Sequence, residues 1–183
     1  MNDFAVRRRV RTTPRLRLEP VGPEHIEDLL ELHREEAVPS PGEAWDREAA
    51  TRSAQRCAAG WALHGAQQWM AYDAASGAVV GRGGVSLQQV EDIDRWEAGW
   101  EVRPGLRGRG YATEIGRAGL DFAFGELGAD EVVAFAEHDN APSLAVMRRL
   151  GMTYRHDIRH CGTPCALYSL KRPPDAGRAR SHG

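Results

Sequence analysis

The residues with the clearest chemical potential lie in a glycine- and arginine-rich segment near the middle of the chain. Residues 97–112 read EAGWEVRPGLRGRGYA, in which an alternating, strand-like stretch runs into Gly108 and Gly110 and then into a predicted helix. Glycines at alternate positions let a loop curl with its backbone N–H groups pointing inward, beside the unpaired N–H groups of the first helical turn. The positive end of the helix dipole favours an anion at the same place. The segment therefore predicts a binding site for a phosphate or a pyrophosphate.

Neither of two common nucleotide-binding motifs fits this loop. A dinucleotide fingerprint needs a third glycine where Thr113 stands, and a parallel strand-helix-strand unit, whereas a predicted hairpin precedes the loop. A P-loop needs Gly-Lys-Ser/Thr, and Lys171 is the chain's one lysine. The countercharge for a phosphate would come from Arg103, Arg107 and Arg109. The alternative interpretation is a tight turn that only connects a strand to a helix.

Length and composition place the chain among ordinary globular proteins. Its 183 residues, 42% hydrophobic and 27% charged, fit one domain with tails and exclude a collagenous, coiled-coil or fully disordered chain. No apolar run approaches the length of a membrane span, and the arginine-rich N-terminus lacks the apolar core of a secretory signal. The odd count of 3 cysteines indicates free thiols in a reducing compartment, so a cytoplasmic location is expected.

Charge is unevenly distributed along the chain. Residues 18–170 carry 14 basic and 24 acidic residues, a net charge of −10, whereas both ends are basic. An acidic body argues against a nucleic-acid partner, because neutralising phosphates supplies most of that affinity. It favours a cationic partner, such as an amine or a basic peptide. Residues 1–12 and 172–183 are expected to be disordered tails.

Periodicity predicts seven strands and four helices in the order β-α-α-β-β-β-α-β-α-β-β. The predicted strands are 15–19, 68–73, 78–87, 97–103, 131–136, 152–160 and 165–171, and the helices are one from Pro23, one from Asp46 towards His64, 111–127 and 140–150. Residues 39–42 and 91–94 are expected as loops. This order indicates an α+β fold, in which helices pack on a mixed sheet without regular strand-helix-strand alternation.

The loop Arg107–Ala112 resembles the acetyl-coenzyme A pyrophosphate loop, (Gln/Arg)-x-x-Gly-x-(Gly/Ala), of the GNAT N-acetyltransferases. Residues 13–18 resemble the family's opening strand, 139–152 its fifth-strand exit and fourth helix, and 165–168 its closing strand. The resemblance covers a domain of about residues 13–171 and is closest to the branch that includes the ribosomal-protein N-terminal (alanine) acetyltransferases. It implies a central, mostly antiparallel sheet of about seven strands flanked by four helices, with a splay between the fourth and fifth strands.

The resemblance also implies that acetyl-CoA is the cosubstrate and that no metal takes part. The pyrophosphate would be held by the backbone amides of Gly108, Arg109, Gly110, Tyr111, Ala112 and Thr113. The pantetheine arm would lie in the splay, along the main chain of Trp100, Glu101 and Val102. Asn140 matches the family asparagine that contacts this arm, although an asparagine before a helix is also a good N-cap.

The reaction implied is direct transfer of acetyl from the thioester to an amine, for which a base and an acid are useful. Many family members place an acidic Tyr seven positions after the Asn, where this chain has Met147. The related branch has a Ser three positions after the Asn, so the resemblance implies Ser143 as the acid or as the residue that stabilises the thiolate. Glu97 and Glu101 lie on one face of the predicted strand. Glu97 occupies the place of a glutamate common in this branch before a Gly-aromatic pair, here Gly99-Trp100, so the resemblance implies Glu97 as the base, acting directly or through water, with Glu101 as the alternative.

A metal site is not expected, because His156, His160, Cys161 and Cys165 cross a predicted hairpin without a metal-ligand spacing. The expected function is acetylation of a primary amine, either a protein N-terminal α-amine or a small cationic amine. A non-catalytic acyl-CoA-binding module remains an alternative because of Met147, as does an unrelated phosphate binder. No nucleic-acid or membrane partner is expected, and the protein is expected to be a monomer or a homodimer.

Overall fold

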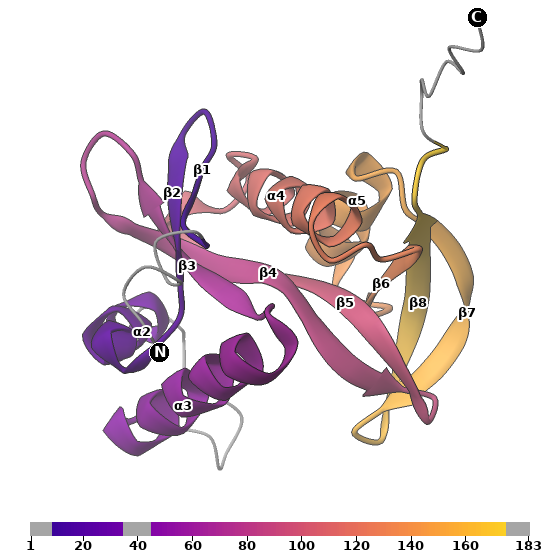
Figure 1. Cartoon of the computed structure of the whole chain (residues 1–183), viewed down its shortest axis with the longest axis horizontal. Coiled ribbons are helices and arrows are strands. Elements are labelled where there is room, and N and C mark those ends of the chain that lie inside the picture. The colour runs from indigo at the N-terminus through magenta and orange to yellow at the C-terminus, as the bar shows by residue number, and fades with distance from the viewer. Residues whose placement is uncertain (1–8, 35–44, 175–183) are drawn as a thin grey trace, which may run out of the picture.

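One eight-stranded sheet organises the computed structural model of the chain, which describes residues 9–34 and 45–174 (Figure 1). The strands are β1 (Arg11–Thr12), β2 (Leu16–Pro20), β3 (Gln68–Asp73), β4 (Val79–Val90), β5 (Ile93–Val102), β6 (Glu131–Glu137), β7 (Thr153–His160) and β8 (Thr163–Lys171). Their order in the sheet is β1-β2-β3-β4-β5-β6-β8-β7, and each neighbouring pair is antiparallel except β5 and β6. The predicted mixed, mostly antiparallel sheet is confirmed.

Helices cover both faces of this sheet. The described residues form the α-helices α2 (Ile26–His33), α3 (Arg47–His64), α4 (Tyr111–Gly125) and α5 (Ala141–Arg149), with short 3-10 turns η1 (Pro23–His25) and η2 (Pro104–Leu106). In Figure 1, α2 and α3 lie on one side of the sheet, and α4 and α5 lie on the other. The predicted α+β arrangement with four helices is therefore confirmed for the described part of the chain.

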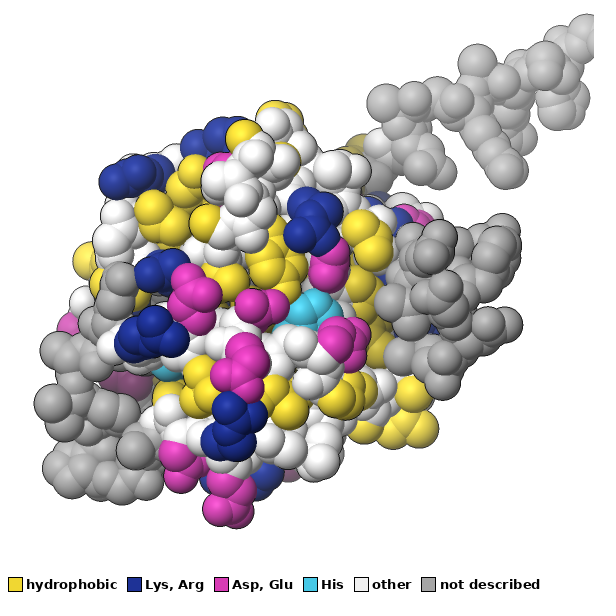
Figure 2. All heavy atoms as spheres, turned by 90° about the vertical axis from the view of Figure 1, so that its left-hand side faces the viewer, with side chains coloured by type: hydrophobic (Ala, Val, Ile, Leu, Met, Phe, Trp, Pro, Cys, Tyr) yellow, Lys and Arg dark blue, Asp and Glu magenta, His cyan; other side chains and the backbone are white. Residues whose placement is uncertain are grey.

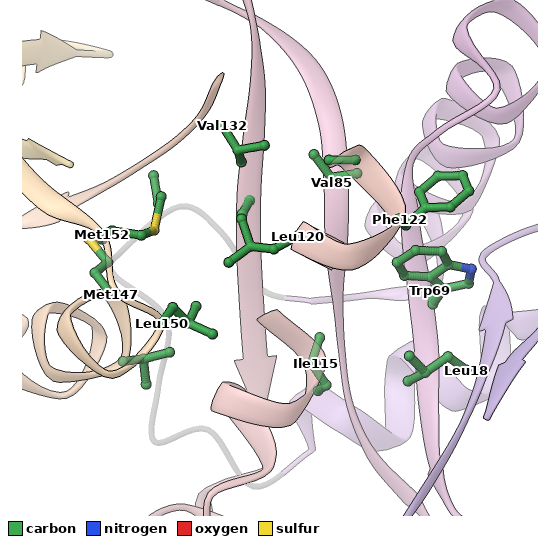
Figure 3. Close-up of a cluster of buried hydrophobic side chains, with 14 of the residues drawn as sticks. Leu18, Trp69, Val85, Ile115, Leu120, Phe122, Val132, Met147, Leu150 and Met152 are labelled. Atoms are coloured by element: carbon green, nitrogen blue, oxygen red, sulfur yellow. The ribbon is translucent and has the colours of Figure 1, made fainter. Parts of the chain in front are cut away.

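The larger cluster of buried side chains lies between the sheet and the pair α4 and α5 (Figure 3). Ile115 and Leu120 of α4 are buried there, and Phe122 meets Trp69 of β3 edge-on with ring centroids 5.2 Å apart. Full burial of each large aliphatic side chain is worth about 1.5–3 kcal/mol. This packing fixes the axis of α4, and therefore the position of the loop that precedes it.

The sheet has one strand more than predicted, because part of the expected N-terminal tail pairs with β2. Arg11 lies opposite Leu18, and Thr12 lies opposite Arg17. The indole N–H of Trp69 also donates to the carbonyl oxygen of Arg9 at 2.8 Å. The domain boundary expected at residue 13 therefore misses this strand, which is too short to show a periodicity of its own.

Two connections differ from their predictions in length. The loop expected at 91–94 is a two-residue turn, in which Glu91 and Asp92 have φ of 53° and 61°. Two-residue turns with positive φ at both central residues match the right-handed twist of the strands that they join. Strands β4 and β5 therefore continue as a paired ribbon up to this turn. Cys161 and Gly162 join β7 to β8 in the same way, so that β8 begins at Thr163 instead of Cys165. The loop expected at 39–42 lies outside the described residues.

The surface around α2 and α3 carries charges of both signs. Figure 2 shows Lys and Arg side chains interspersed with Asp and Glu side chains on this face, with no single extended basic area. Arg47 pairs with Glu27 at 2.6 Å, and Arg103 pairs with Glu31 at 2.8 Å. Such a mixture does not resemble the basic stripe that phosphate-backbone binding needs.

Glu114 joins the β1–β2 connection to the first turn of α4. Its carboxylate accepts hydrogen bonds from the Thr13 hydroxyl, the Arg15 backbone N–H and the Arg15 Nε. Burial alone would raise the pKa of this carboxyl, but the hydrogen bonds from Thr13 and Arg15 outweigh burial and lower it. Ionisation of the Glu114 carboxyl therefore stabilises the folded protein.

We expect Glu114→Gln to lower the free energy of unfolding by about 1 kcal/mol at pH 7. Because the pKa is lower in the folded state, this contribution is complete above the ordinary value of 4.5 and is lost as pH falls through the folded-state value. Urea unfolding at pH 7 and at low pH tests this. The matched variant Glu126→Gln removes only an exposed pairing with Arg11 and should cost less. Equal losses for the two variants, or a loss independent of pH, would contradict the assignment.

Candidate active site

The sheet opens between β5 and β6, the one parallel pair. These strands share a single register position, Glu97 opposite Val133, whereas β4 and β5 pair continuously from Gly81 and Val102 to their common turn. Beyond Glu97, β5 is therefore bordered by a gap on the side of β6. The predicted splay is confirmed, and it exposes one edge of the main chain of residues 100–102.

The loop before α4 has the backbone that its sequence predicts. Gly108 and Gly110 have φ of 76° and 84°, which is the left-handed region that only glycine enters without strain. Gly110 is the N-cap residue, and the first helical hydrogen bond runs from the Glu114 N–H to its carbonyl oxygen at 3.1 Å. The N–H groups of residues 108–113 donate to no other residue in the described part of the chain. This row of donors at a helix N-terminus suits a pyrophosphate.

A cavity of about 670 Å³, here called the cofactor cavity, lies along this loop. It is lined by Trp100, Val102, Leu106, Arg107, Gly108, Arg109, Gly110, Tyr111, Ala112, Thr113, Pro142, Ser143, Ala145, Val146 and Arg149. All six predicted amide residues, and two of the three predicted pantetheine residues, therefore lie on one cavity. Arg149 comes from the end of α5 and was not predicted.

The arginines around the loop have different roles. Arg15 donates to the Arg109 carbonyl oxygen at 2.9 Å and stacks over the Tyr111 ring at 4.5 Å, so it holds the loop from the β1–β2 side. Arg107 Nε donates to the Val102 carbonyl oxygen at 3.1 Å. Arg103, predicted as countercharge, lines neither cavity of the site and pairs with Glu31 of α2 instead.

A second cavity of about 470 Å³, here called the acceptor cleft, adjoins the first. It is lined by Gln68, Glu97, Ala98, Gly99, Trp100, Glu101, Phe135, Ala136, Glu137, Asn140, Ser143, Met147, His160, Cys161, Thr163 and Cys165. Trp100 and Ser143 line both cavities and mark where they meet. The two predicted catalytic residues, Glu97 and Ser143, therefore lie on the same cleft, next to the cofactor cavity.

Glu97 is the strongest candidate for a base. Its carboxylate has no hydrogen-bond or ion-pair partner among the described residues, and burial raises its pKa to about 7. A carboxyl with that pKa takes up and releases protons near neutral pH, as a general base requires. Gly99 follows on the same face of β5 and adds no side chain, so the space in front of the carboxylate stays open.

Glu101, the alternative base, is engaged by neighbouring charges. One of its carboxylate oxygens accepts from Arg82 Nε at 2.7 Å, and the other lies 3.1 Å from His33 Nδ1. Arg82 and His33 are in turn packed against the Trp45 ring, at 4.9 Å and 3.7 Å from its centroid. Glu101 is thus occupied by two neighbours, whereas the Glu97 carboxylate has no such partner among the described residues.

The first turn of α5 carries the remaining predicted residues. Asn140 is the N-cap, since its Oδ1 accepts from the Ser143 N–H at 3.1 Å, and it also lines the acceptor cleft. Its two predicted roles are therefore structurally compatible. Ser143 lines both cavities, and its hydroxyl has no hydrogen-bond partner among the described residues. Met147 is 1% exposed and lines the cleft at the position where many family members place a tyrosine.

The residues considered as metal ligands lie in two different places in the structure. His160, Cys161 and Cys165 line the acceptor cleft, whereas His156 pairs with Glu91 at 3.0 Å near the other hairpin. Within residues 9–34 and 45–174, no three or more His, Cys, Asp or Glu side chains are grouped to hold a metal ion. The cysteines are free thiols.

Sequence reasoning missed the far wall of the acceptor cleft. Phe135 and Glu137 of β6 and the β7–β8 turn form this wall. Strand alternation on β6 did place Phe135 and Glu137 on one face, but nothing in the sequence showed which strand lies opposite.

The acceptor cleft and the loop of residues 108–113, here called the amide loop, together define a class of protein. The sequence model of the acetyltransferase (GNAT) domain matches residues 15–153. The chain belongs to the GNAT acetyltransferase family, as the loop resemblance indicated. The cosubstrate of this family is acetyl-CoA. None of the helices in the described residues is both long and apolar enough to cross a membrane.

Individual proteins are similar to this chain over different lengths. Uncharacterized protein YkkB of Bacillus subtilis strain 168 is 33% identical over 108 residues, 59% of this chain and 63% of that relative. The N-acetyltransferase YnaD of the same organism is 32% identical over 66 residues, 36% of this chain and 39% of that relative. The matched segment therefore spans less than two thirds of either relative.

Solved structures share the fold over nearly the whole domain. An acetyltransferase from Agrobacterium tumefaciens strain C58 has a TM-score of 0.72 at 24% identity, covering 88% of this chain and 93% of that chain. The ribosomal-protein-S5-alanine acetyltransferase from Vibrio fischeri has a TM-score of 0.69 at 14% identity, covering 89% and 96%. These structural similarities show the fold. The branch of the family and the acceptor substrate have to be argued from the site itself.

Proposed function

We propose that this protein transfers the acetyl group of acetyl-CoA to the primary amine of a cationic acceptor by direct attack on the thioester. The observation that carries the proposal is Glu97, an unpaired carboxyl with a pKa of about 7 in a cleft that adjoins the amide loop. Tight binding alone would not need a base at that place. The alternative of a non-catalytic acyl-CoA-binding module, which Met147 suggested, leaves Glu97 without a role.

The two cavities have opposite charge, and this supports the assignment of their ligands. Among the described residues, the cofactor cavity is lined by Arg107, Arg109 and Arg149 and by no acidic residue. The described residues that line the acceptor cleft include Glu97, Glu101 and Glu137 and no Lys or Arg. An anionic pyrophosphate suits the first and an ammonium group suits the second, since complementary potentials attract and orient charged ligands.

The reaction follows from these positions. Glu97 takes a proton from the ammonium group of the acceptor, and the neutral amine attacks the thioester carbon. The C–N bond forms, the C–S bond breaks, and the second amine proton passes to the sulfur. The Ser143 hydroxyl, at the junction of the cavities, donates a hydrogen bond to the departing thiolate. The products are an N-acetyl amide, coenzyme A and one released proton.

We expect Ser143→Ala to lower kcat by about tenfold while changing the affinity for acetyl-CoA by less than about twofold, since one hydrogen bond to a charged group is worth about 1.5–3 kcal/mol. This change keeps the hydrogen bond that the Ser143 backbone N–H donates to Asn140 Oδ1. Ser143→Thr, which keeps the hydroxyl, is the matched control and should recover most of the rate. A wild-type kcat in Ser143→Ala would contradict a catalytic role and leave Ser143 with a structural role only, in the first turn of α5.

A screen of amines, with coenzyme A thiol release as the readout, tests the proposed function. The panel contains small cationic amines, peptides with free N-termini and anionic amino acids. We expect turnover with cationic acceptors and none with anionic ones. Acetyl-CoA binding without turnover on any amine would favour the non-catalytic module. Turnover confined to anionic amines would contradict the cationic acceptor.

A further inference from the structure

Arg15 contacts the amide loop from the side that faces away from the cosubstrate. It lies in the β1–β2 connection and lines neither the cofactor cavity nor the acceptor cleft. It lines instead a third cavity of about 730 Å³, between this connection and α4. Gly110 lines both this third cavity and the cofactor cavity. The amide loop therefore separates Arg15 from the cofactor cavity.

The Arg15 guanidinium group is held rigidly in this place. Glu114 accepts hydrogen bonds from the Arg15 backbone N–H at 2.9 Å and from Nε at 2.7 Å, and its Oε2 lies 2.6 Å from Nη2. The Arg15 carbonyl oxygen accepts from the Ala74 N–H at 2.9 Å. The remaining nitrogen of the planar group, Nη1, donates to the Arg109 carbonyl oxygen at 2.9 Å. Arg15 thus ties this carbonyl group to the first turn of α4.

This hydrogen bond fixes the orientation of the peptide group between Arg109 and Gly110. In a trans peptide the carbonyl oxygen and the N–H point in opposite directions. Because the Arg109 carbonyl oxygen is directed at Arg15, the Gly110 N–H is directed away from it. The cofactor cavity lies on that side of the loop. The contact with Arg15 therefore makes the Gly110 N–H available to an anion in the cofactor cavity.

The glycine at position 110 makes the opposite orientation accessible as well. Turning this peptide plane by half a rotation mainly changes ψ of Arg109 and φ of Gly110. It would take the Gly110 φ from 84° into the negative region, which glycine enters equally readily. The Arg109 carbonyl oxygen would then point into the cofactor cavity and repel a pyrophosphate. Arg15 favours the orientation that binds an anion over the one that repels it.

We propose that Arg15 is a positioning residue for acetyl-CoA, which selects the peptide orientation that presents the Gly110 N–H to the pyrophosphate. This inference rests on the proposed function, since it takes the amide loop as the pyrophosphate site. It goes beyond that function by assigning a role to a residue outside both cavities of the site. Because Arg15 acts through the loop, its effect should depend on the pyrophosphate of the acetyl donor.

Calorimetry with coenzyme A tests the inference without turnover. We expect Arg15→Met to weaken binding by about tenfold, which is the loss expected for one hydrogen bond from a charged group. Arg15→Lys keeps the charge, but its single nitrogen cannot serve both Glu114 and the Arg109 carbonyl oxygen in the geometry of the guanidinium fork. We therefore expect Arg15→Lys to weaken binding by about threefold or more.

Arg17 provides the matched control on the neighbouring strand. It stacks over the Tyr72 ring at 4.7 Å and pairs with Glu19, as Arg15 stacks over Tyr111 at 4.5 Å and pairs with Glu114. It makes no hydrogen bond or ion pair with the amide loop. Arg17→Met removes the same charge and the same kind of stacking, so it should lower the thermal unfolding temperature in a similar way. Its affinity for coenzyme A should remain that of the wild type.

Steady-state kinetics with two acetyl donors separates positioning from a general structural role. We expect Arg15→Met to raise KM for acetyl-CoA about tenfold and to change kcat by less than about twofold. With S-acetylpantetheine, which has no pyrophosphate, kcat/KM should be the same in the variant and the wild type. A general loss of structure would lower the rate with both donors.

The outcomes distinguish this inference from the proposed function. Wild-type affinity for coenzyme A in Arg15→Met, equal losses in Arg15→Met and Arg17→Met, or full recovery in Arg15→Lys would overturn the inference while the proposed function stands. Full recovery would mean that charge alone matters and that the orientation of the peptide does not. Absence of coenzyme A binding to the wild type would overturn the proposed function and the inference together.

Discussion

Glu97→Gln is expected to lower kcat by about 100-fold or more, because general-base catalysis contributes roughly 10²–10⁴. Affinity for acetyl-CoA should stay within about twofold, since Glu97 lines the acceptor cleft and not the cofactor cavity. In the wild type, kcat/KM should rise with pH through about 7, because Glu97 accepts a proton only when it is ionised. In Glu97→Gln, kcat/KM should no longer rise with pH through this range. Steady-state kinetics between pH 5.5 and 9 measures both effects.

Glu101→Gln is the comparison that decides between the two candidate bases. It removes a carboxylate from the same face of the same strand, but one already held by Arg82 and His33. A smaller loss of kcat is expected, and the rise of kcat/KM through pH 7 should remain. If Glu101→Gln removed that rise and Glu97→Gln kept it, the assignment of the base would be reversed.

Gly110→Asp is expected to weaken acetyl-CoA binding by about 100-fold or more. A side chain at φ of 84° is strained. A Cβ at this position would lie 3.4 Å from Arg15 Nη2, so the new carboxylate would stand beside the loop and would crowd and repel the pyrophosphate. Loss of several charge-assisted hydrogen bonds, each worth about 1.5–3 kcal/mol, accounts for the size of the effect. Isothermal calorimetry with acetyl-CoA measures it.

The chain offers a matched control for this change in Gly128, which follows the other end of α4. Gly128 has φ of 70°, so Gly128→Asp brings the same strain and the same charge far from the loop. Thermal unfolding should show similar losses of stability for the two variants. Affinity for acetyl-CoA should fall in Gly110→Asp alone. Equal affinities would contradict the loop assignment.

The parts of the site that the sequence predicted are those encoded by local backbone rules. The two glycines of the loop have the positive φ that their spacing suggested, and Asn140 caps α5. Asp46 likewise caps α3, through a hydrogen bond from the Ala49 N–H at 2.8 Å. Each of these features depends on residues a few positions apart, so the sequence alone carries the information.

The parts that the sequence did not predict depend on contacts between distant segments. Arg103 was expected at the phosphate, but Glu31 of α2 lies close enough to pair with it. The wall formed by Phe135 and Glu137 depends on which strand lies across the splay, and strand pairing is not a local property. The strand at Arg11 and Thr12 forms by pairing with the free edge of β2.

Binding of acetyl-CoA, measured by calorimetry beside coenzyme A and ADP, tests the central claim most directly. The claim is that the amide loop and the splay together bind the cosubstrate. The predicted result is tight binding of acetyl-CoA and coenzyme A, with ADP at least about tenfold weaker because it lacks the pantetheine arm that the splay would hold. Equal affinity for ADP, or no binding of acetyl-CoA, would contradict the claim.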